Sequence, residues 1–299
     1  MFVIAHRATF GVVPICRALG VNVASVRSRL SRPLPARALA DEALSKLILE
    51  LYEENYSVYG ARKLRKALRR EHGLVVDKDR VGRLMRELGI RGVHRGRQPF
   101  TTRPDAANPR APDLVKRRFV ADRPNQLWVS DFTYVSTWSG FVYAAFIIDV
   151  YSRMVVGWRV STTMTAALVG DALEHAIWLR RSPLDGVITH SDAGSQYTSI
   201  VYTERLAEIG ALASIGTIGD SYDNAMAEAF NALYKTELTK RRGPWRDAEH
   251  LEAATMAYIV WFNNKRLHSE IGNIPPAEFE ANYYAHLRTG NNGPTPPVI

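Results

Sequence analysis

The chain has 299 residues, of which 46% are hydrophobic and 23% charged, so we expect a protein with a buried core and not a wholly disordered one. No run reaches the roughly 18 apolar residues of a membrane span, and a single cysteine, Cys16, excludes a disulfide framework or a cysteine-rich zinc module; we predict a cytoplasmic protein. The net charge of +9 is uneven, because residues 1–120 carry 25 Lys and Arg against 11 Asp and Glu, whereas residues 121–299 carry 14 against 19. This asymmetry predicts a basic part that binds a polyanion such as nucleic acid, with a solubilising basic surface as the alternative.

The first 90 residues read as helical. Residues 1–40 are predicted to be an N-terminal helical segment, with a pair of short helices over 10–33. Apolar residues then recur every three or four positions in three further stretches, which are 41–56, 61–73 and 75–90.

The last of these helices carries cations on the face opposite its apolar residues, namely Lys78, Arg80, Arg83 and Arg86. Short helices with tight connections and a cationic final helix predict a helix-turn-helix DNA-binding domain over residues 41–90. The alternative is a small helical bundle whose arginines face water. Residues 91–123 are rich in Pro, Gly and Arg, which predicts a basic linker that lies along phosphates, with Arg95 and Arg97 as DNA contacts.

From residue 124 the pattern changes to β-branched and aromatic segments. Three consecutive antiparallel strands are expected, followed by alternating helices and short strands, and then by helices. The predicted strands are 126–136, 141–152, 154–161, 186–192 and 211–215, and the predicted helices are 165–181, 199–210, 221–238 and 247–264. This order predicts an α/β fold, a ribonuclease-H-like core with a five-stranded mixed sheet over residues 124–288, preceded by the small all-α helix-turn-helix domain and followed by a flexible tail at 289–299.

Three carboxylates are candidates for chemistry. Asp131 interrupts an apolar strand, Asp192 ends a short strand, and Glu228 lies on a helix. Strand ends and helix faces can converge, and three carboxylates shared by two Mg²⁺ ions would suit an in-line displacement at a phosphodiester. Taken singly, each has an ordinary explanation: an ion pair with an arginine for Asp131, a helix cap for Asp192, and a solvated surface position for Glu228.

Other polar and aromatic residues are predicted to be structural. Asp149 is expected to pair with Arg153, Asp223 and Asn224 to cap a helix, and His190 to be a hydrogen-bonded strand residue. The aromatic side chains of the strand region are expected to pack in the core or at its rim, namely Tyr134, Tyr143, Tyr151, Trp128, Trp138, Trp158 and Trp178. The polar turn near residue 268 adds Lys265, Arg266 and His268 as predicted DNA contacts.

Several stretches of the sequence together resemble a known family. NQLWVSDFTYVSTWSGFVYAAFIIDVYSRMVVGW, ITHSDAGSQYTS, SYDNAMAEAFNALYKTEL and WFNNKRLHSEIGNIPPAEFE are similar to the successive blocks of second-frame transposases of insertion-sequence-3-like elements, which are bacterial relatives of retroviral integrases. YGARKLRKAL and VGRLMRELGIRG resemble the helix-turn-helix that precedes that core. The likeness covers about residues 40–285.

The resemblance implies a DNA-cutting and DNA-joining enzyme. It places the catalytic, metal-binding acids at Asp131, Asp192 and Glu228, with two Mg²⁺ or Mn²⁺ ions, and it implies that Lys235 approaches the end of the element. Ala193 stands where the family usually has a basic residue. With one cysteine, the zinc domain of retroviral integrases cannot form here.

The resemblance also implies partners. These are the terminal inverted repeats and target DNA, a dimer or higher oligomer on DNA, an upstream-frame product as partner or fusion, and a nucleoid-associated location in a bacterial cytoplasm. Two alternatives are kept open: a helix-turn-helix regulator without catalysis, and a simple nuclease of the same fold.

Overall fold

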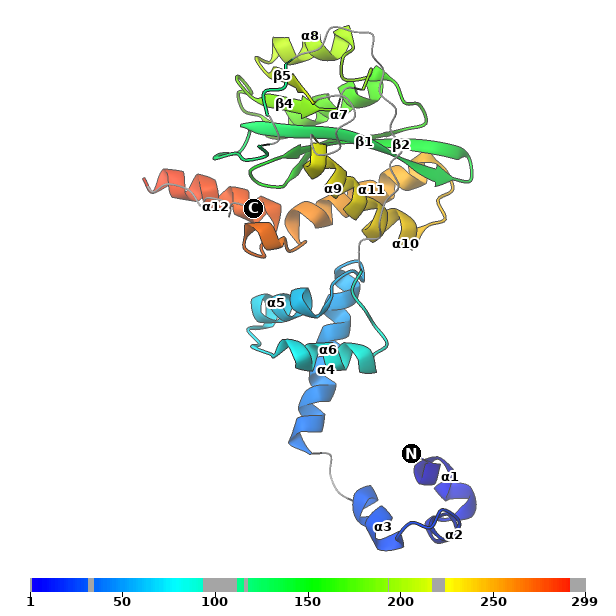
Figure 1. Ribbon diagram of the computed structural model, residues 1–299. Coiled ribbons are helices and arrows are strands. Elements are labelled where there is room, and N and C mark those ends of the chain that lie inside the picture. The colour runs from blue at the N-terminus through cyan, green and yellow to red at the C-terminus, as the bar shows by residue number, and fades with distance from the viewer. Residues whose placement is uncertain are drawn as a thin grey trace. The chain divides into compact units, whose positions relative to one another are not determined.

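Figure 1 shows the computed structural model of the chain, which describes residues 2–31, 35–93, 112–115, 118–192, 194–216 and 224–290. They form two compact units, of which the first ends at Leu49 and the second begins at Glu50. Within the described ranges, no helix combines the length and the apolar character that a membrane crossing requires.

The first unit is built from short helices. These are α1 (Phe2–Phe10), α2 (Val12–Ala18), α3 (Val23–Ser31) and most of α4 (Ala36–Glu54), which contains the boundary with the second unit. The side chain of Asn22 accepts hydrogen bonds from the N–H groups of Ala24 and Ser25, at 2.8 and 3.2 Å, and so caps the start of α3. The helical pair expected over residues 10–33 is present, and a further helix precedes it.

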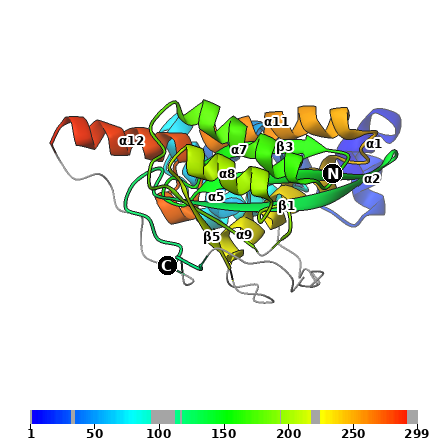
Figure 2. The same ribbon diagram turned by 90° about the horizontal axis from the view of Figure 1, so that it is seen from above.

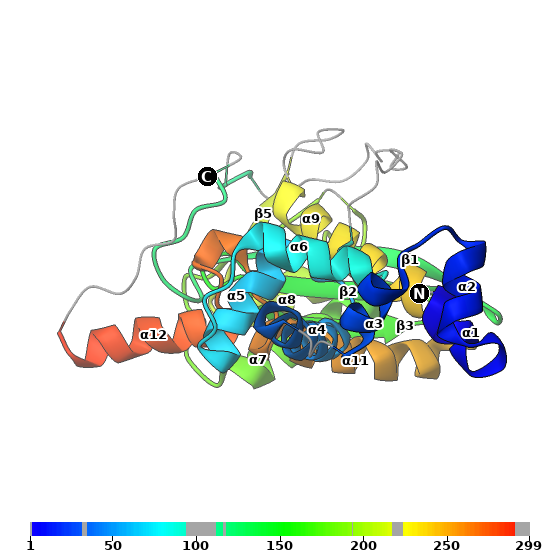
Figure 3. The same cartoon turned by 90° about the horizontal axis from the view of Figure 1, so that it is seen from below.

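After the end of α4, the second unit holds two of the predicted helices, α5 (Ala61–His72) and α6 (Lys78–Glu87), which pack against each other (Figure 3). Helix α5 ends at Gly73, whose φ of +68° is the left-handed conformation that glycine adopts at a helix C-terminus. Helix α6 begins at Asp77, whose carboxylate accepts the N–H of Asp79 at 2.7 Å. The helix predictions for 61–73 and 75–90 are therefore confirmed.

A mixed sheet forms the centre of this unit. Its strands are β1 (Leu127–Thr137), β2 (Gly140–Asp149), β3 (Val155–Ser161), β4 (Ile188–Ser191) and β5 (Leu212–Ile215). They lie in the order β3-β2-β1-β4-β5, in which β2 runs antiparallel to both β3 and β1, and β4 runs parallel to both β1 and β5. The predicted five-stranded mixed sheet of a ribonuclease-H-like core is confirmed.

Helices cover both faces of the sheet (Figures 1 and 2). On one face lie α7 (Ala166–Arg180) and α8 (Ile200–Glu208), over a core that includes Trp128 and Leu173. On the other lie α9 (Ala225–Tyr234) and α11 (Ala248–Asn264), where the ring of Phe146 packs on Phe230 with 4.8 Å between centroids. Because successive strand residues point to opposite faces, each strand contributes to both cores.

The C-terminal part holds elements that the sequence pattern had not indicated. Helix α9 continues as a π-helical turn at Lys235–Thr239 and then as the short α10 (Lys240–Arg242). After α11, a 3₁₀ turn at Ser269–Ile271 leads into α12 (Pro276–Arg288), which begins with a proline in its first turn.

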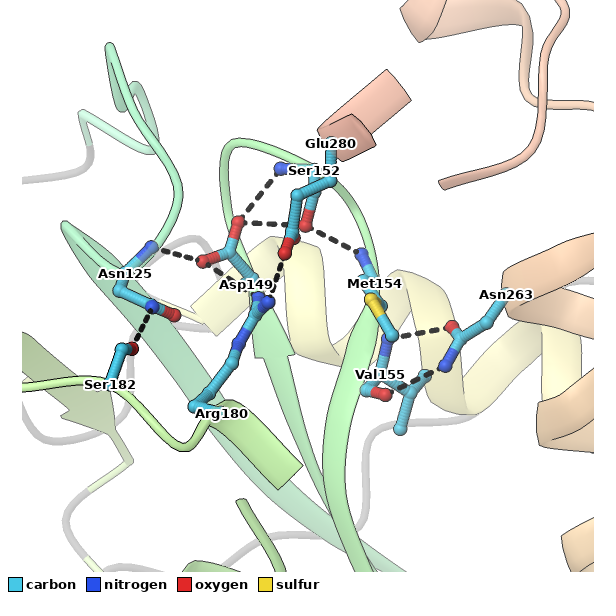
Figure 4. Close-up of polar contacts among 9 residues, drawn as sticks. All are labelled: Asn125, Asp149, Ser152, Met154, Val155, Arg180, Ser182, Asn263 and Glu280. Atoms are coloured by element: carbon cyan, nitrogen blue, oxygen red, sulfur yellow. Dashed lines mark hydrogen bonds and ion pairs between the residues drawn. The ribbon is translucent and has the colours of Figure 1, made fainter. Parts of the chain in front are cut away.

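A buried charged cluster anchors α12 to the end of β2 (Figure 4). The carboxylate of Asp149, which is fully buried, accepts the N–H groups of Asn125 and Ser152 at 2.7 and 2.8 Å and lies 3.4 Å from the guanidinium of Arg180. Arg180 also pairs with Glu280 of α12. The predicted partner of Asp149 was therefore wrong: the side chain of Arg153 lies instead near Glu270, at 3.9 Å.

Replacing Glu280 by Ala is expected to lower the free energy of unfolding by about 1.5–3 kcal/mol, because a charged hydrogen bond to a buried guanidinium is lost. Chemical denaturation measures the change. The control is Glu204→Ala on the exposed face of α8, for which we expect a change within about 0.5 kcal/mol. Equal losses in the two variants would show that Glu280 does not anchor α12.

Candidate active site

The pairing of β1 with β4 places two of the predicted acids side by side. These strands run parallel, and their register pairs Ser130 with Ser191. Asp131 directly follows Ser130 on β1, and Asp192 directly follows Ser191 at the end of β4. Because paired residues of adjacent parallel strands lie about 4.8 Å apart and point to the same side, the two carboxylates start from neighbouring positions.

Helix α9 brings the third acid to the same strand. The side-chain amide of Asn224, at the helix N-terminus, donates to the carbonyl of Ser130 at 3.0 Å, and that of Asn231 donates to the carboxylate of Asp131 at 2.8 Å. Glu228 lies between these two contacts, three residues before Asn231 and so on the same face of the helix. The first turns of α9 are thereby fixed along β1, with Glu228 on the same helix face as Asn231, which contacts Asp131.

The pKa values of the three acids are raised, in each case by burial first. The pKa of Asp131 is raised to about 8, first by burial and then by the charges of Asp192 and Glu228. The hydrogen bonds from the Phe132 N–H and from Asn231 act in the opposite direction and lower this pKa. Burial also raises the pKa of Asp192, opposed by the Gly194 N–H and by His190. The pKa of Glu228 is raised by burial and then by the charge of Asp192.

The donor set suits a divalent cation. Mg²⁺ and Mn²⁺ take carboxylate oxygens, and a nearby cation would favour the ionised form of Asp131, which burial and then the charge of Asp192 disfavour. In the part of the chain that the structure describes, no group of three or more His, Cys, Asp or Glu side chains is placed so that it could hold a metal ion. One carboxylate oxygen of Asp131 accepts a hydrogen bond from the side-chain amide of Asn231, and the other accepts one from the N–H of Phe132.

Lys235 extends this face of α9 by one more turn. Its ammonium group lies over the ring of Tyr134, 4.8 Å from the centroid. Burial and the neighbouring Lys240 lower the pKa of Lys235, whereas the charge of Asp131 raises it. Tyr134 and Trp138, which were expected to pack in the core or at its rim, are 46% and 73% exposed, so neither lies in the core.

A cavity of about 890 Å³ lies on the opposite face of α9. Met226, Ala229 and Leu233 of α9 line one side, and the cations Arg62, Lys63, Lys78, Arg86 and Arg91 line the other. Of the α6 cations predicted to contact DNA, Lys78 and Arg86 line this cavity and are exposed. Arg80 and Arg83 are partly buried, and Arg83 pairs with Glu87 at 2.7 Å.

Two predicted DNA contacts belong to the interior. Arg266 is 5% exposed and donates to both carboxylate oxygens of Glu237, at 2.6 and 2.9 Å, and His268 is 9% exposed. Burial, followed by the charge of Arg266, lowers the pKa of His268 well below its usual value. Because neither side chain faces solvent, the prediction that they contact DNA is corrected; the adjacent Lys265 is exposed.

The remaining predictions divide between the described and the undescribed residues. His190 is buried and hydrogen-bonded to the hydroxyl of Ser214 at 2.9 Å, as predicted. Asn224 is the N-terminal cap residue of α9. Arg95, Arg97, Ala193 and Asp223 lie outside the described residues.

Sequence reasoning missed Asn231 and Glu237. Asn231 could have been found from its spacing, since it lies three residues after Glu228 and four before Lys235, on the same helical face. Glu237 carried no comparable signal, because its partner Arg266 follows 29 residues later.

Comparisons with known proteins place these observations in a family. The sequence matches the integrase core domain over residues 121–221 and 210–276, and the HTH-like domain over residues 39–98. The transposase of insertion sequence element IS629 from Shigella sonnei is 49% identical over 286 residues, which are 94% of this chain and 95% of that protein. The transposase of IS3411 from Escherichia coli is 48% identical over 182 residues, 59% of this chain and 75% of that protein. Among solved structures, the HTLV-2 integrase catalytic core domain in complex with magnesium is 17% identical, with a TM-score of 0.42 over 52% of this chain and 96% of that one.

Proposed function

Because the chain belongs to the family of insertion-sequence transposases, enzymes that cleave and transfer DNA, we propose that it does so with Asp131, Asp192 and Glu228 as its catalytic acids. The observation that carries this proposal is the register of β1 and β4, which pairs Ser130 with Ser191, the residues directly before Asp131 and Asp192. Helix α9, fixed to β1 through Asn224 and Asn231, adds Glu228.

The three carboxylates would hold two Mg²⁺ or Mn²⁺ ions. Such ions supply an activated water or 3′-hydroxyl nucleophile and stabilise the leaving oxygen of a phosphodiester. The protein's own part is to present the carboxylate oxygens and to orient them, which Asn231 does for Asp131 at 2.8 Å. Lys235, next along the same helix face, would hold a DNA phosphate near the acids.

DNA is proposed to bind over a wider surface. We assign residues 41–90 as the DNA-binding domain, residues 91–123 as its basic linker and residues 124–288 as the catalytic core. Lys78 and Arg86 on α6, together with Lys265, would contact the phosphates of the terminal inverted repeats. Because two ends of the element and a target DNA must be held together in one reaction, we expect a dimer or higher oligomer on DNA. An upstream-frame product is proposed as a further partner.

The test is a cleavage and strand-transfer assay on a duplex that carries the inverted repeats flanking the gene, with Mg²⁺ or Mn²⁺. We expect Asp192→Asn to lose cleavage and joining together, because both steps use the same acids. Asp185→Asn, an exposed aspartate seven residues earlier in the chain, should keep both activities. Undiminished activity in Asp192→Asn would contradict the assignment of the acids. Binding without cleavage by the wild type would favour the regulator or a missing upstream-frame partner, and cleavage without joining would favour the nuclease.

A further inference from the structure

Exposed aromatic side chains gather on the hairpin that joins β1 to β2. Tyr134, Trp138 and Phe141 are 46%, 73% and 60% exposed, and the rings of Tyr134 and Phe141 meet edge to face with 5.5 Å between centroids. Folding favours the burial of such rings, so a group of them in solvent indicates a surface that binds something.

This aromatic surface is reached by a cation from the helix that carries Glu228. Tyr134 follows Asp131 by three residues on β1, so its side chain starts on the opposite face of the sheet, but the ammonium of Lys235, seven residues after Glu228, lies over its ring at 4.8 Å from the centroid. The contact between this cation and the ring therefore places Tyr134 next to the C-terminal end of α9, the helix that holds Asp131 through Asn231.

The hairpin is held in place by the segment that follows α9. The N–H of Trp138 donates to the carbonyl of Trp245 at 2.9 Å, and that of Ser139 to the carbonyl of Arg246 at 3.2 Å. Trp245 is buried, and its indole N–H donates to the carbonyl of Thr239, which ends the π-helical turn, at 3.0 Å. The aromatic surface is thus ordered before any ligand arrives, which lowers the entropic cost of binding.

We propose that Tyr134 and Phe141 stack against one unpaired nucleobase of the element end, the base next to the phosphate that the acids cut. An aromatic ring with an adjacent cation is the combination by which proteins hold single-stranded nucleic acid, and stacking accepts any base because every base has a π face. The base must be unpaired, since a paired base has both faces covered by its neighbours in the duplex. The nearby cations Lys240, Arg241 and Arg242 favour a polyanion over an apolar protein surface. The proposal rests on the proposed function, because the acids define which base is meant.

A binding experiment without catalysis tests the contact. 5-Iodouridine replaces the nucleotide beside the scissile phosphate, and the complex with the full-length chain is irradiated in the absence of divalent ions. We expect the crosslinked peptide to contain Tyr134 or Phe141, and the yield to fall in Tyr134→Ala. A crosslink confined to other segments of the chain would overturn the proposal.

A thermodynamic cycle tests the role of the contact in the reaction. Cleavage rates are compared on an intact end and on an end in which that base is absent and only its sugar remains. With the base present, Tyr134→Ala should be slower by about tenfold or more, whereas Tyr134→Phe, which keeps the ring, should stay near the wild type. On the abasic end, Tyr134→Ala should cause little further loss, because the base and the ring act together.

The matched control is Trp178→Ala on α7. Trp178 is 63% exposed and has Arg181 over its ring at 5.2 Å, the same combination on a helix that carries none of the acids. It should match the wild type on both substrates. Equal slowing of Tyr134→Ala on the intact and abasic ends would overturn the stacking proposal while leaving the acids in place. A chain that crosslinks as expected but does not cut would contradict the proposed function and support the stacking contact.

Discussion

Asp131→Asn is expected to lose strand cleavage by about 10²–10³-fold or more while raising the thermal midpoint of the metal-free protein. The loss follows because the carboxylate is proposed to act on the reacting phosphate, where removal of one stabilising group has effects of this size. The gain follows because burial and the charges of Asp192 and Glu228 disfavour an ionised Asp131, which raises its pKa to about 8. The amide has no charge to bury.

The gain in stability should depend on pH in a defined direction. The folded protein holds the proton of Asp131 up to about pH 8, whereas the unfolded chain releases it near its ordinary value of 3.8. Between these values the wild type loses stability as the pH rises, so the advantage of the variant should grow from pH 5 to pH 8. Scanning calorimetry without metal measures it. A midpoint of Asp131→Asn at or below that of the wild type at pH 8 would contradict this account.

Metal binding gives the complementary measurement. Mg²⁺ or Mn²⁺ should raise the thermal midpoint of the wild type, because a ligand that binds only the folded state stabilises it. The rise should be larger at pH 8 than at pH 6, since Asp131 must lose its proton to become a ligand. Asp131→Asn should respond less to the metal, whereas Asp185→Asn should respond like the wild type.

Arg266→Ala is expected to lower the free energy of unfolding by about 3–5 kcal/mol, because it leaves the carboxylate of Glu237 buried without its partner. Arg266 reaches both carboxylate oxygens, and the hydroxyl of Tyr258 donates to one of them at 3.0 Å. The pair joins the π-helical turn after α9 to the segment after α11. Lys265→Ala, an exposed neighbour, should change the free energy by less than about 0.5 kcal/mol.

Acid should reduce the difference between Arg266→Ala and the wild type. Burial alone would raise the pKa of Glu237, but the guanidinium of Arg266 holds this pKa below its ordinary value of 4.5. A lowered folded pKa gives stability that is present above pH 4.5 and is lost as the pH falls through the folded pKa. Denaturation at pH 7 and near pH 3.5 tests this expectation. A difference that stays constant over this range would show that the ion pair is not its source.

Much of the fold could be predicted because the sequence pattern is local. The alternation of apolar residues along 126–136 and the three- to four-residue spacing in 61–73 reflect which side chains face a core, whatever that core contains. Helix α12 was missed because its pattern is weak: its docking depends on Glu280 reaching Arg180, which lies 100 residues earlier in the chain.

The residue types of the candidate site could be predicted as well, but their neighbours could not. An acid inside an apolar strand calls for a special environment, so Asp131 was conspicuous in the sequence. The partner of Asp149, the burial of Arg266 and His268, and the exposure of Tyr134 depend on which segments meet, and no local pattern contains that information.

The sequence by itself indicated most of the order of strands and helices and the basic N-terminal part, because propensity, periodicity and charge act between residues close in the chain, and its resemblance to a family singled out the three acids as candidates. The tertiary structure alone decided that Ser130 pairs with Ser191, that Asn231 holds Asp131, and that Lys235 lies over Tyr134. Each of these contacts joins separate elements, and their geometry is set by how the sheet and α9 pack against each other.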